Sequence, residues 1–241
     1  MRWKTSLTKI ENEQEIIRGH NLQQLVQTKT FVEVIWLLLK GQLPNAAETR
    51  LANALFAAAI DHGVGAPSAT VARMVASTGN SLHTAVAAGV QTLGERHGGA
   101  IEGAAEFFQE NVNVTDVTGL VKSLKDKKNR IPGYGHKVLT HDHRADTLFT
   151  IAKETGGYGK HCTFAAAVGE ALNKISSKPL PLNIDGAMGA IISDLGFDWC
   201  LAQGFFIIGR VPGLVAQVYE ELTSGAGVRR LSEEEIEYIG Q

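Results

Sequence analysis

The residues best suited to chemistry in this chain are histidines at glycine-rich breaks between expected helices. A neutral imidazole acts as an acid, a base or a hydrogen-bond donor near pH 7. One histidine at such a break is more often structural than catalytic, but several at helix ends favour a catalytic interpretation if an arginine and a carboxylate, here Arg144 and Asp185, lie in reach of one pocket. The four histidines at such breaks are His20, His62, His97 and His136.

The stretch Ile131-Pro-Gly-Tyr-Gly-His136 is a glycine-rich turn that ends on a histidine. It lacks the spacing and the preceding strand of a phosphate loop or a dinucleotide fingerprint, so nucleoside triphosphate and nicotinamide binding are not expected. The chain also has no Gly-x-Ser-x-Gly nucleophile elbow. His141 and His143 suggest a metal site, but no carboxylate cluster completes it in the sequence, so we predict that no metal is bound.

Composition favours a soluble protein whose partners are small molecules or copies of itself. The chain has 241 residues, 44% of them hydrophobic, and a net charge of −2, so it offers no overall basic field for nucleic acid. The N-terminus lacks the apolar core of a signal peptide, and the apolar runs at 34–39 and 55–60 are shorter than the ~20 residues that span a bilayer. We therefore expect a cytoplasmic protein, with Cys162 and Cys200 as buried thiols.

The elements expected to position these residues are helices, because apolar residues recur at helical spacing and no alternating strand pattern is seen. Thr30 and Glu33 form a capping box, and Gly41 with Pro44 ends the helix that follows. Residues 1–20 show no firm period and suit a short strand pair or an arm. The class is therefore all-α. The expected helices are 31–39, 46–61, 71–78, 82–93, 100–110, 144–154, 164–175, 188–195, 211–222 and a short one at 233–235.

The order of several motifs resembles the citrate synthase superfamily over nearly the whole chain. The turn that ends on His136, the element Asp-His-Arg144-Ala and the element Asn-Ile-Asp185 match the family's Gly-[Tyr/Phe/Ile]-Gly-His, Asp-Pro-Arg-Ala-like and Asn-Val-Asp elements. Asp61-His62 and Arg96-His97-Gly-Gly-Ala look like its two upstream histidine sites. The resemblance implies a citrate synthase-like helical fold, with a large helical domain of residues 1–136 and 186–241 and a small helical lobe of residues 137–185.

Two features resemble the citryl-CoA lyase branch, known as a free small enzyme and as the C-terminal module of ATP-citrate lyase. The chain is shorter than a full citrate synthase, and Gly186 follows Asp185 where synthases usually carry an aromatic residue. This branch cleaves citryl-CoA to acetyl-CoA and oxaloacetate. His97, whose position is aromatic in ATP-citrate lyase, keeps a small citrate or 2-methylcitrate synthase open as an alternative. A non-catalytic acyl-CoA-binding or assembly subunit is an alternative of another class.

The resemblance also implies a role for each site residue. Asp185 moves the proton at the acetyl carbon, His136 meets the oxygen that is hydroxyl in citryl-CoA and ketone in oxaloacetate, and His97 hydrogen-bonds the thioester oxygen. The side chains expected to hold the substrate are His62, Arg144, Arg210 and Arg230. The residues expected to seat coenzyme A are Pro132, Gly133, Tyr134 and Gly135.

The remaining implications concern coenzyme A and the assembly. The coenzyme A thioester is a substrate, and no permanently bound cofactor is implied. The basic segment 122–130 is either a solvated face or the place where Lys122, Lys125, Lys128 or Arg130 meets the coenzyme phosphates. A homodimer or larger homo-oligomer is expected, with sites near the subunit contact, and a citryl-CoA synthetase is a conceivable partner.

Overall fold

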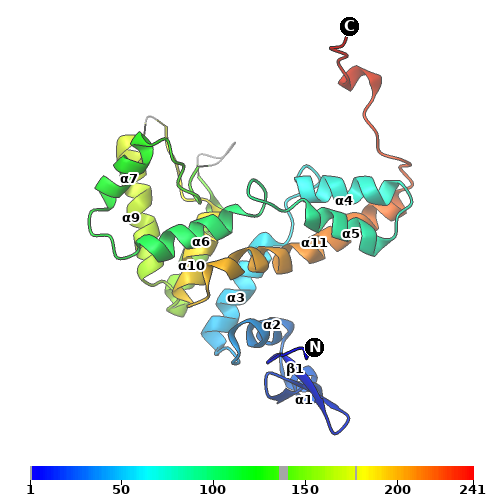
Figure 1. The fold of residues 1–241 in the computed structure, drawn as a ribbon, viewed down its shortest axis with the longest axis horizontal. Helices are drawn as coiled ribbons and strands as arrows, with labels where there is room; N and C mark the ends of the chain where they lie inside the picture. Colours follow the sequence, from blue (N-terminus) through cyan, green and yellow to red (C-terminus); the bar gives the residue numbers. More distant parts are fainter. Residues whose placement is uncertain (1, 136–140, 177) are drawn as a thin grey trace.

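The computed structural model describes residues 2–135, 141–176 and 178–241 and has a helical architecture (Figure 1). The helices of the described part are α1 (Leu22–Thr28), α2 (Phe31–Lys40), α3 (Ala46–Ala59), α4 (Pro67–Ser77), α5 (Leu82–Gln91), α6 (Ala100–Asn111), α7 (Val117–Asp126), α8 (His143–Thr155), α9 (Lys160–Ile175), α10 (Ile184–Asp194) and α11 (Ala202–Ser224), with short 3-10 turns at Trp199–Leu201 and Glu233–Glu235. The predicted all-α class is confirmed.

The N-terminal segment forms the strand pair that the sequence left open, with a third short strand added. Antiparallel β1 (Thr8–Glu11) and β2 (Gln14–Ile17) are joined by Asn12 and Glu13, which both have positive φ, as a tight hairpin turn requires. The strand β3 (His20–Asn21) pairs with β2. This small sheet lies with α1 and α2 at one end of the molecule (Figure 1).

Local sequence signals set several helix ends as predicted. Thr30 and Glu33 form the capping box of α2, and Gly41 ends that helix with a left-handed φ of 85°. Ser232 and Glu235 likewise form a capping box at the start of the Glu233–Glu235 element, which is a single 3-10 turn. The helices α1 and α7 were not predicted. The first has only seven residues, whereas α7 carries Val117, Leu120, Val121 and Leu124 at helical spacing, a signal that the sequence reasoning missed.

The main apolar cluster surrounds α10, which is buried on all sides from Gly186 to Ser193. The helices α6, α8 and α9 contact α10 directly. At Gly189, an added Cβ would lie 2.9 Å from the backbone nitrogen of Ala105 on α6, so these two helices touch backbone to backbone. Because α8 and α9 share this cluster, the division into a large domain and a lobe of residues 137–185 stays a prediction.

A second, smaller cluster joins α4 and α5 to the C-terminal half of α11. These helices form an arm beside the main cluster, and the chain beyond Ser224 runs away from the arm as an exposed tail (Figure 1). The span Trp199–Ser224 is, by length and composition, long and apolar enough to cross a membrane. This property does not by itself indicate a membrane span, because a core helix of a soluble protein meets the same test. In this structure α11 packs against α3, α4 and α5.

The two cysteines differ in environment. Cys162 is buried, as predicted, and burial raises the pKa of its thiol. Cys200 is exposed, so the expectation of a second buried thiol is wrong. It lies in the 3-10 turn that leads into α11, where its backbone N–H bonds Asp198 Oδ1 at 3.0 Å.

The glycine turn at 133–135 is joined to the start of α10 by a short backbone bridge. Gly133 O accepts from Asn183 N at 3.0 Å, and Gly135 N donates to Pro181 O at 2.8 Å. Gly133 and Gly135 both have positive φ. A Cβ on Gly133 would lie 2.6 Å from the Cα of Gly186, so both glycines are needed where the two backbones meet.

A methyl group at residue 186 therefore tests this contact. We expect Gly186→Ala to lower the free energy of unfolding by about 1–3 kcal/mol, because the added carbon would meet Gly133 O and the side chain of Leu182. The matched control is Gly204→Ala in α11, where a Cβ meets nothing within 4 Å and alanine should stabilise by about 0.5–1 kcal/mol. Urea denaturation measures both variants, and equal stability of the two would contradict the constraint.

Candidate active site

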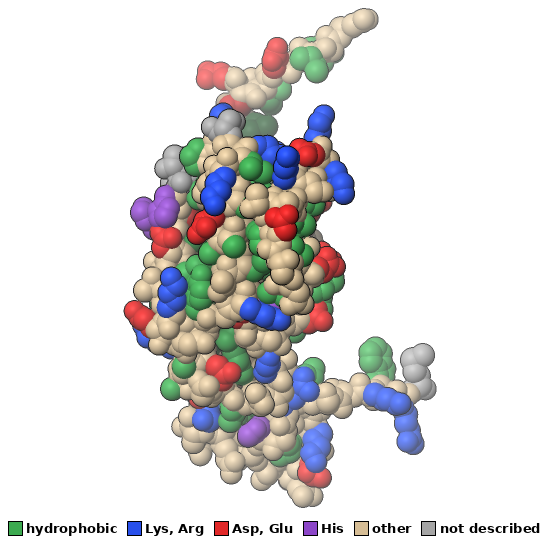
Figure 2. Space-filling model, turned by 90° about the vertical axis from the view of Figure 1, so that its left-hand side faces the viewer, with side chains coloured by type: hydrophobic (Ala, Val, Ile, Leu, Met, Phe, Trp, Pro, Cys, Tyr) green, Lys and Arg blue, Asp and Glu red, His purple; other side chains and the backbone are tan. Residues whose placement is uncertain are grey.

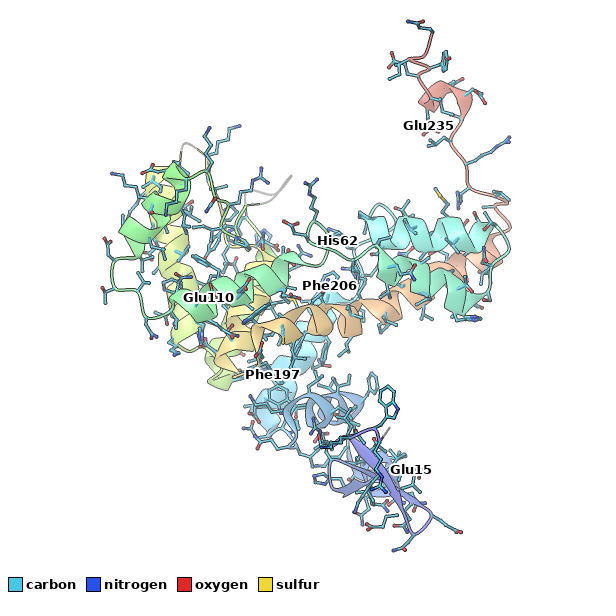
Figure 3. The ribbon with its side chains drawn as sticks, in the orientation of Figure 1. Glu15, His62, Glu110, Phe197, Phe206 and Glu235 are labelled. Atoms are coloured by element: carbon cyan, nitrogen blue, oxygen red, sulfur yellow. The ribbon has the colours of Figure 1, made fainter. Side chains whose placement is uncertain are left out.

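A cavity of about 180 Å³ at the junction of the main cluster and the arm brings together five of the predicted site residues. They are His62, His97, Arg144, Asp185 and Arg210. They come from the loop after α3, the turn before α6, and the helices α8, α10 and α11. Figure 3 labels His62 and Phe206, which both line this cavity. Of the other two predicted catalytic and substrate-binding residues, Arg230 does not line this cavity and His136 lies outside the described residues.

The two glycines after His97 are needed by the turn that carries it. Gly94 and His97 exchange backbone hydrogen bonds of 2.8 and 2.9 Å, and Gly99 N also donates to Gly94 O at 2.9 Å. Gly98 has a φ of +80°, and a Cβ on it would lie 2.8 Å from the ring of Phe206. The motif His-Gly-Gly is therefore the sequence of a tight turn that sets an imidazole at the cavity wall.

The hydrogen bonds of His97 determine which ring nitrogen carries the proton. The backbone N–H of Ser68, in the first turn of α4, donates to His97 Nε2 at 3.2 Å, and Ser68 Oγ lies 2.9 Å from the same nitrogen. Because Nε2 accepts, a neutral ring carries its hydrogen on Nδ1. Burial lowers the pKa of His97, and the charges of Arg210 and His62 lower it further. The ring is thus held as a neutral donor.

Asp142 holds two parts of the site together. Its buried carboxylate accepts from Arg144 Nε and Nη2, each at 3.0 Å, and from the backbone N–H of Ile184 at 3.0 Å. Burial raises the pKa of Asp142, but the hydrogen bonds and charge of Arg144 with the Ile184 bond outweigh it, so the pKa lies below its ordinary value. The carboxylate therefore fixes Arg144 against the start of α10.

Arg144 and Arg210 present two cations to the cavity. Arg144 Nη1 lies 3.4 Å from His62 Nδ1. Arg210 is buried, donates from Nε to Ala59 O at 2.7 Å and lies 4.7 Å over the ring of Phe206. Burial lowers the pKa of Arg210, the charges of Asp61 and Asp185 raise it, and that of Arg144 lowers it. Two planar guanidinium groups suit a ligand with more than one carboxylate.

Asp185 lies in the first turn of α10, half-buried at the cavity wall. The helix is capped by Asn183, whose Oδ1 accepts from Gly186 N at 3.1 Å and whose Nδ2 donates to Gly135 O at 2.9 Å. Pro179 and Pro181 favour an extended backbone in the segment that leads to this cap. The carboxylate is thus tied, through backbone, to the glycine turn.

A larger cavity of about 520 Å³ lies beside the glycine turn. Lys125, Lys128, Arg130, Tyr134 and Gly135 line it. Figure 2 shows the molecule from the left-hand side of Figure 1, with Lys and Arg side chains on its upper part among Asp and Glu side chains. Tyr134 has an anchoring role, because its hydroxyl donates to Ala165 O at 2.6 Å and its burial raises its pKa. Lys122 is exposed but does not line this cavity.

Arg230 is the predicted substrate ligand that the structure does not bring to the cavity of its own chain. It is exposed in the C-terminal tail, six residues beyond the end of α11 at Ser224. The neighbouring Arg229 is bound to the buried carboxylate of Glu221, with Nε and Nη2 at 2.7 and 3.0 Å from its oxygens. Of the two adjacent arginines, Arg229 therefore fixes the start of the tail and Arg230 extends from it.

Three residues of the site were missed by the sequence reasoning. Asp142 gave a signal, because an acidic residue directly before a helix is a common N-cap, and it precedes Arg144 by two residues. Arg96 lines the small cavity and adjoins His97 in the sequence. Ser68 gave no signal, because only the fold sets the first turn of α4 against His97.

Comparison with known sequences agrees with these motifs. A family model described as the citrate synthase C-terminal domain matches residues 1–59 and 45–231, in two overlapping segments. A probable ATP-citrate synthase from Dictyostelium discoideum is 30% identical over an alignment of 229 positions that covers 86% of this chain. Citrate synthase 2 from Bacillus subtilis is 28% identical over an alignment of 194 positions that covers 79% of this chain. The chain spans only 36% and 52% of the lengths of these curated relatives.

Solved structures extend the similarity to the whole chain. The structure of citryl-CoA lyase from Hydrogenobacter thermophilus is 48% identical, with a TM-score of 0.95, covering 99% of this chain and 95% of that one. The ATP citrate lyase of Methanothrix soehngenii, in complex with citrate and coenzyme A, is 25% identical with a TM-score of 0.91. That match covers all of this chain and 42% of the other. A citrate synthase from Thermotoga maritima, at 19% identity and a TM-score of 0.65, shares the fold.

The environment of His97 predicts its titration. In the unfolded chain its pKa is near 6.5, and in the folded protein it should be lower, because burial and the charges of Arg210 and His62 disfavour the protonated ring. The neutral ring therefore contributes fully to the free energy of unfolding above about pH 6.5, and this contribution is lost as the pH falls through the folded pKa. Imidazole ¹⁵N NMR should show the Nδ1–H tautomer with a midpoint below that in urea. A midpoint at or above the urea value would contradict the assignment.

Proposed function

The chain belongs to the citrate synthase family, and on that premise we propose that it is a citryl-CoA lyase, which cleaves citryl-CoA to acetyl-CoA and oxaloacetate. The observation that carries this proposal is the similarity to the Hydrogenobacter enzyme, which extends over nearly the full length of both chains. The Gly186 contact supports it, since a larger residue after Asp185, as in synthases, does not fit against the backbone of Gly133.

The proposed reaction assigns one task to each group at the small cavity. Arg144, Arg210 and His62 hold the carboxylates of the citryl group. His136 takes the hydroxyl proton, the carbon–carbon bond breaks to leave oxaloacetate, and its electron pair forms the enolate of acetyl-CoA. Asp185, protonated at that stage, gives its proton to the acetyl carbon. Proton exchange with solvent then removes the proton from His136 and returns one to Asp185.

His97 is suited to the charge that develops in this reaction. The thioester oxygen becomes negative as the enolate forms, so a hydrogen-bond donor aimed at it stabilises the transition state. A neutral ring with its hydrogen on Nδ1, fixed from behind by Ser68, supplies such a donor without giving up its proton. This is why the lowered pKa of His97 supports the proposal.

The larger cavity is the proposed seat of coenzyme A, which acts as part of the substrate. Of the four residues predicted to seat it, Tyr134 and Gly135 line this cavity, and Pro132 and Gly133 directly precede them in the chain. The positive side chains of the lining suit phosphate groups. No other cofactor is part of the proposal. Because Gly133–Gly135 is bonded to the segment before Asp185, coenzyme A seated there would direct its thioester toward the small cavity.

The assembly and the location of the protein are also proposed. A homodimer or larger homo-oligomer would allow Arg230, exposed on its tail, to reach the small cavity of a second copy and bind a substrate carboxylate. The exposed apolar residues of α11, Val215, Tyr219 and Leu222, suit burial in such a contact. We propose a cytoplasmic enzyme that receives citryl-CoA from a citryl-CoA synthetase.

Product analysis tests the proposed reaction. Purified protein given citryl-CoA should release oxaloacetate, detected by coupled NADH oxidation, and acetyl-CoA, with no free coenzyme A thiol. Asp185→Asn should lower kcat by roughly 10²–10⁴-fold, because the acid that serves the acetyl carbon is lost. The control is His83→Ala, an exposed histidine on α5 that does not line the cavity. Release of free coenzyme A and citrate would instead support the synthase, and no turnover would support the non-catalytic subunit.

A charge-removal series tests the coenzyme A cavity. We expect the double variant Lys125→Ala/Arg130→Ala to raise the KM for citryl-CoA by roughly tenfold with kcat little changed, since the lost contacts bind phosphate equally in the ground and transition states. The matched control is Lys127→Ala, an exposed lysine of the same segment that does not line the cavity. Equal KM values for the two variants at low salt would overturn the assignment.

A further inference from the structure

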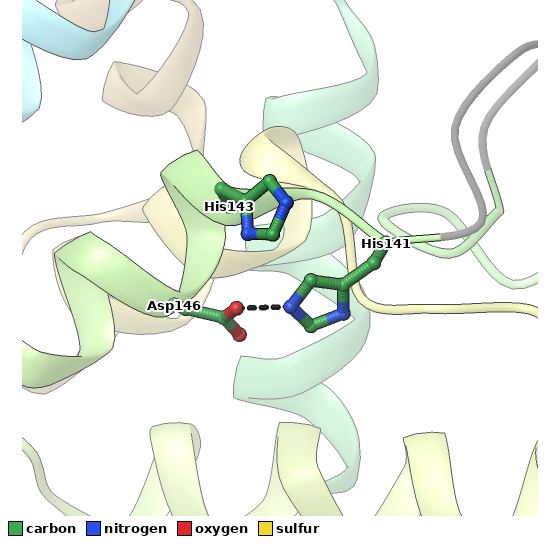
Figure 4. A group of neighbouring side chains, drawn as sticks. All are labelled: His141, His143 and Asp146. Carbon is green, nitrogen blue, oxygen red and sulfur yellow. Dashed lines mark hydrogen bonds and ion pairs between the residues drawn. The ribbon is translucent and has the colours of Figure 1, made fainter.

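Two histidines and an aspartate gather on the outer surface where α8 begins. His141, His143 and Asp146 are all exposed, and each offers a ligand atom that lies within 4.8 Å of the other two. Figure 4 shows the two rings turned toward the carboxylate, with His141 Nε2 in contact with Asp146 Oδ2. The ring centroids of the two histidines are 4.9 Å apart. None of the three lines the small cavity or the coenzyme A cavity.

The helix start explains why these side chains converge. His143 and Asp146 are the first and fourth residues of α8, so their side chains share one face of the helix. Asp142, the N-cap between the two histidines, is turned inward and buried by its bonds to Arg144 and Ile184. Because the N-cap points inward, the residues on either side of it point outward. The position of the three ligands is therefore fixed by the same turn that positions Arg144.

We propose that His141, His143 and Asp146 form a surface site for a divalent transition metal, with Zn²⁺ as the best match. The absence of a metal was predicted because no carboxylate completed the His-x-His pair, and Asp146 supplies that carboxylate in space. Two imidazole nitrogens and one carboxylate oxygen suit Zn²⁺, Co²⁺ or Ni²⁺, whereas Mg²⁺ and Ca²⁺ prefer oxygen ligands. Three protein ligands leave at least one position for water.

The geometry requires only side-chain adjustment. Zinc bonds nitrogen at about 2.0–2.1 Å and carboxylate oxygen at about 2.0–2.2 Å, so tetrahedral ligand atoms lie about 3.3 Å apart. All three side chains are exposed, so they are free to rotate toward that spacing without displacing buried groups. The ion takes the place of the proton in the contact between His141 and Asp146. The positive end of α8 opposes a cation, so a dissociation constant on the order of micromolar is expected, weaker than in closed sites.

Metal binding is independent of the proposed lyase reaction and is measured without it. Untagged full-length protein, freed of metal by chelator and dialysis, is titrated with Co²⁺ by visible absorption and with Zn²⁺ by calorimetry. One equivalent should bind, with Co²⁺ bands of a site with fewer than six ligands. His143→Ala and Asp146→Asn should each weaken binding by at least tenfold.

Control variants exclude other sources of metal binding. His20→Ala removes an exposed histidine of the small sheet, and Cys200→Ser removes the exposed thiol; both should bind as tightly as the original protein. Circular dichroism checks that the surface variants keep their helix content. Two results would overturn the proposal. One is that the protein shows no saturable binding up to about 100 μM Zn²⁺. The other is that Asp146→Asn and His143→Ala bind the metal with unchanged affinity.

Discussion

The contact between Gly133 and Gly186 is the constraint on which the rest of the site depends. Two backbones approach so closely that neither residue can carry a Cβ without displacing the other. Through this contact, and through the bonds of Asn183 to the turn, the larger cavity is fixed relative to the first turn of α10. Since α10 is the buried centre of the main cluster, the backbone of Asp185 is anchored directly beside the core.

Buried charge is the second organising influence. Asp142 is held ionised in a dry setting only because Arg144 and the Ile184 N–H satisfy its oxygens, and the same bonds hold the guanidinium at the cavity. His97 responds in the opposite way: burial and neighbouring cations keep it uncharged. One pocket thus contains fixed cations for carboxylates and a neutral donor for an oxygen that gains charge, as the proposed reaction requires.

The arm is held by an apolar cluster that is separate from the main one. The main cluster fixes α6, α8, α9 and α10 together, whereas α4, α5 and the end of α11 form a thin cluster of their own. His97 lies between them, because its ring is bonded to Ser68 at the first turn of α4. The small cavity is therefore sensitive to how the arm is held, which gives the proposed subunit contact a physical link to the site.

The sequence by itself determined the helical class, several helix ends and the identity of the chemical groups. Capping boxes, glycine stops and glycine-flanked histidines act over a few residues, so Thr30, Gly41 and His97 could be interpreted from their neighbours alone. The motif order also pointed to the family, which the comparisons show.

Only the tertiary structure decided which groups meet. The bond from Ser68 to His97, the link from Asp142 to Ile184 and the contact of Gly133 with Gly186 each join residues 29 to 53 positions apart. It also separated Arg230 from the cavity and brought Asp146 to His141 and His143. The physical reason is that local signals fix backbone conformation within a turn, whereas proximity across the fold is set by packing of the buried helices, which no short stretch of sequence encodes.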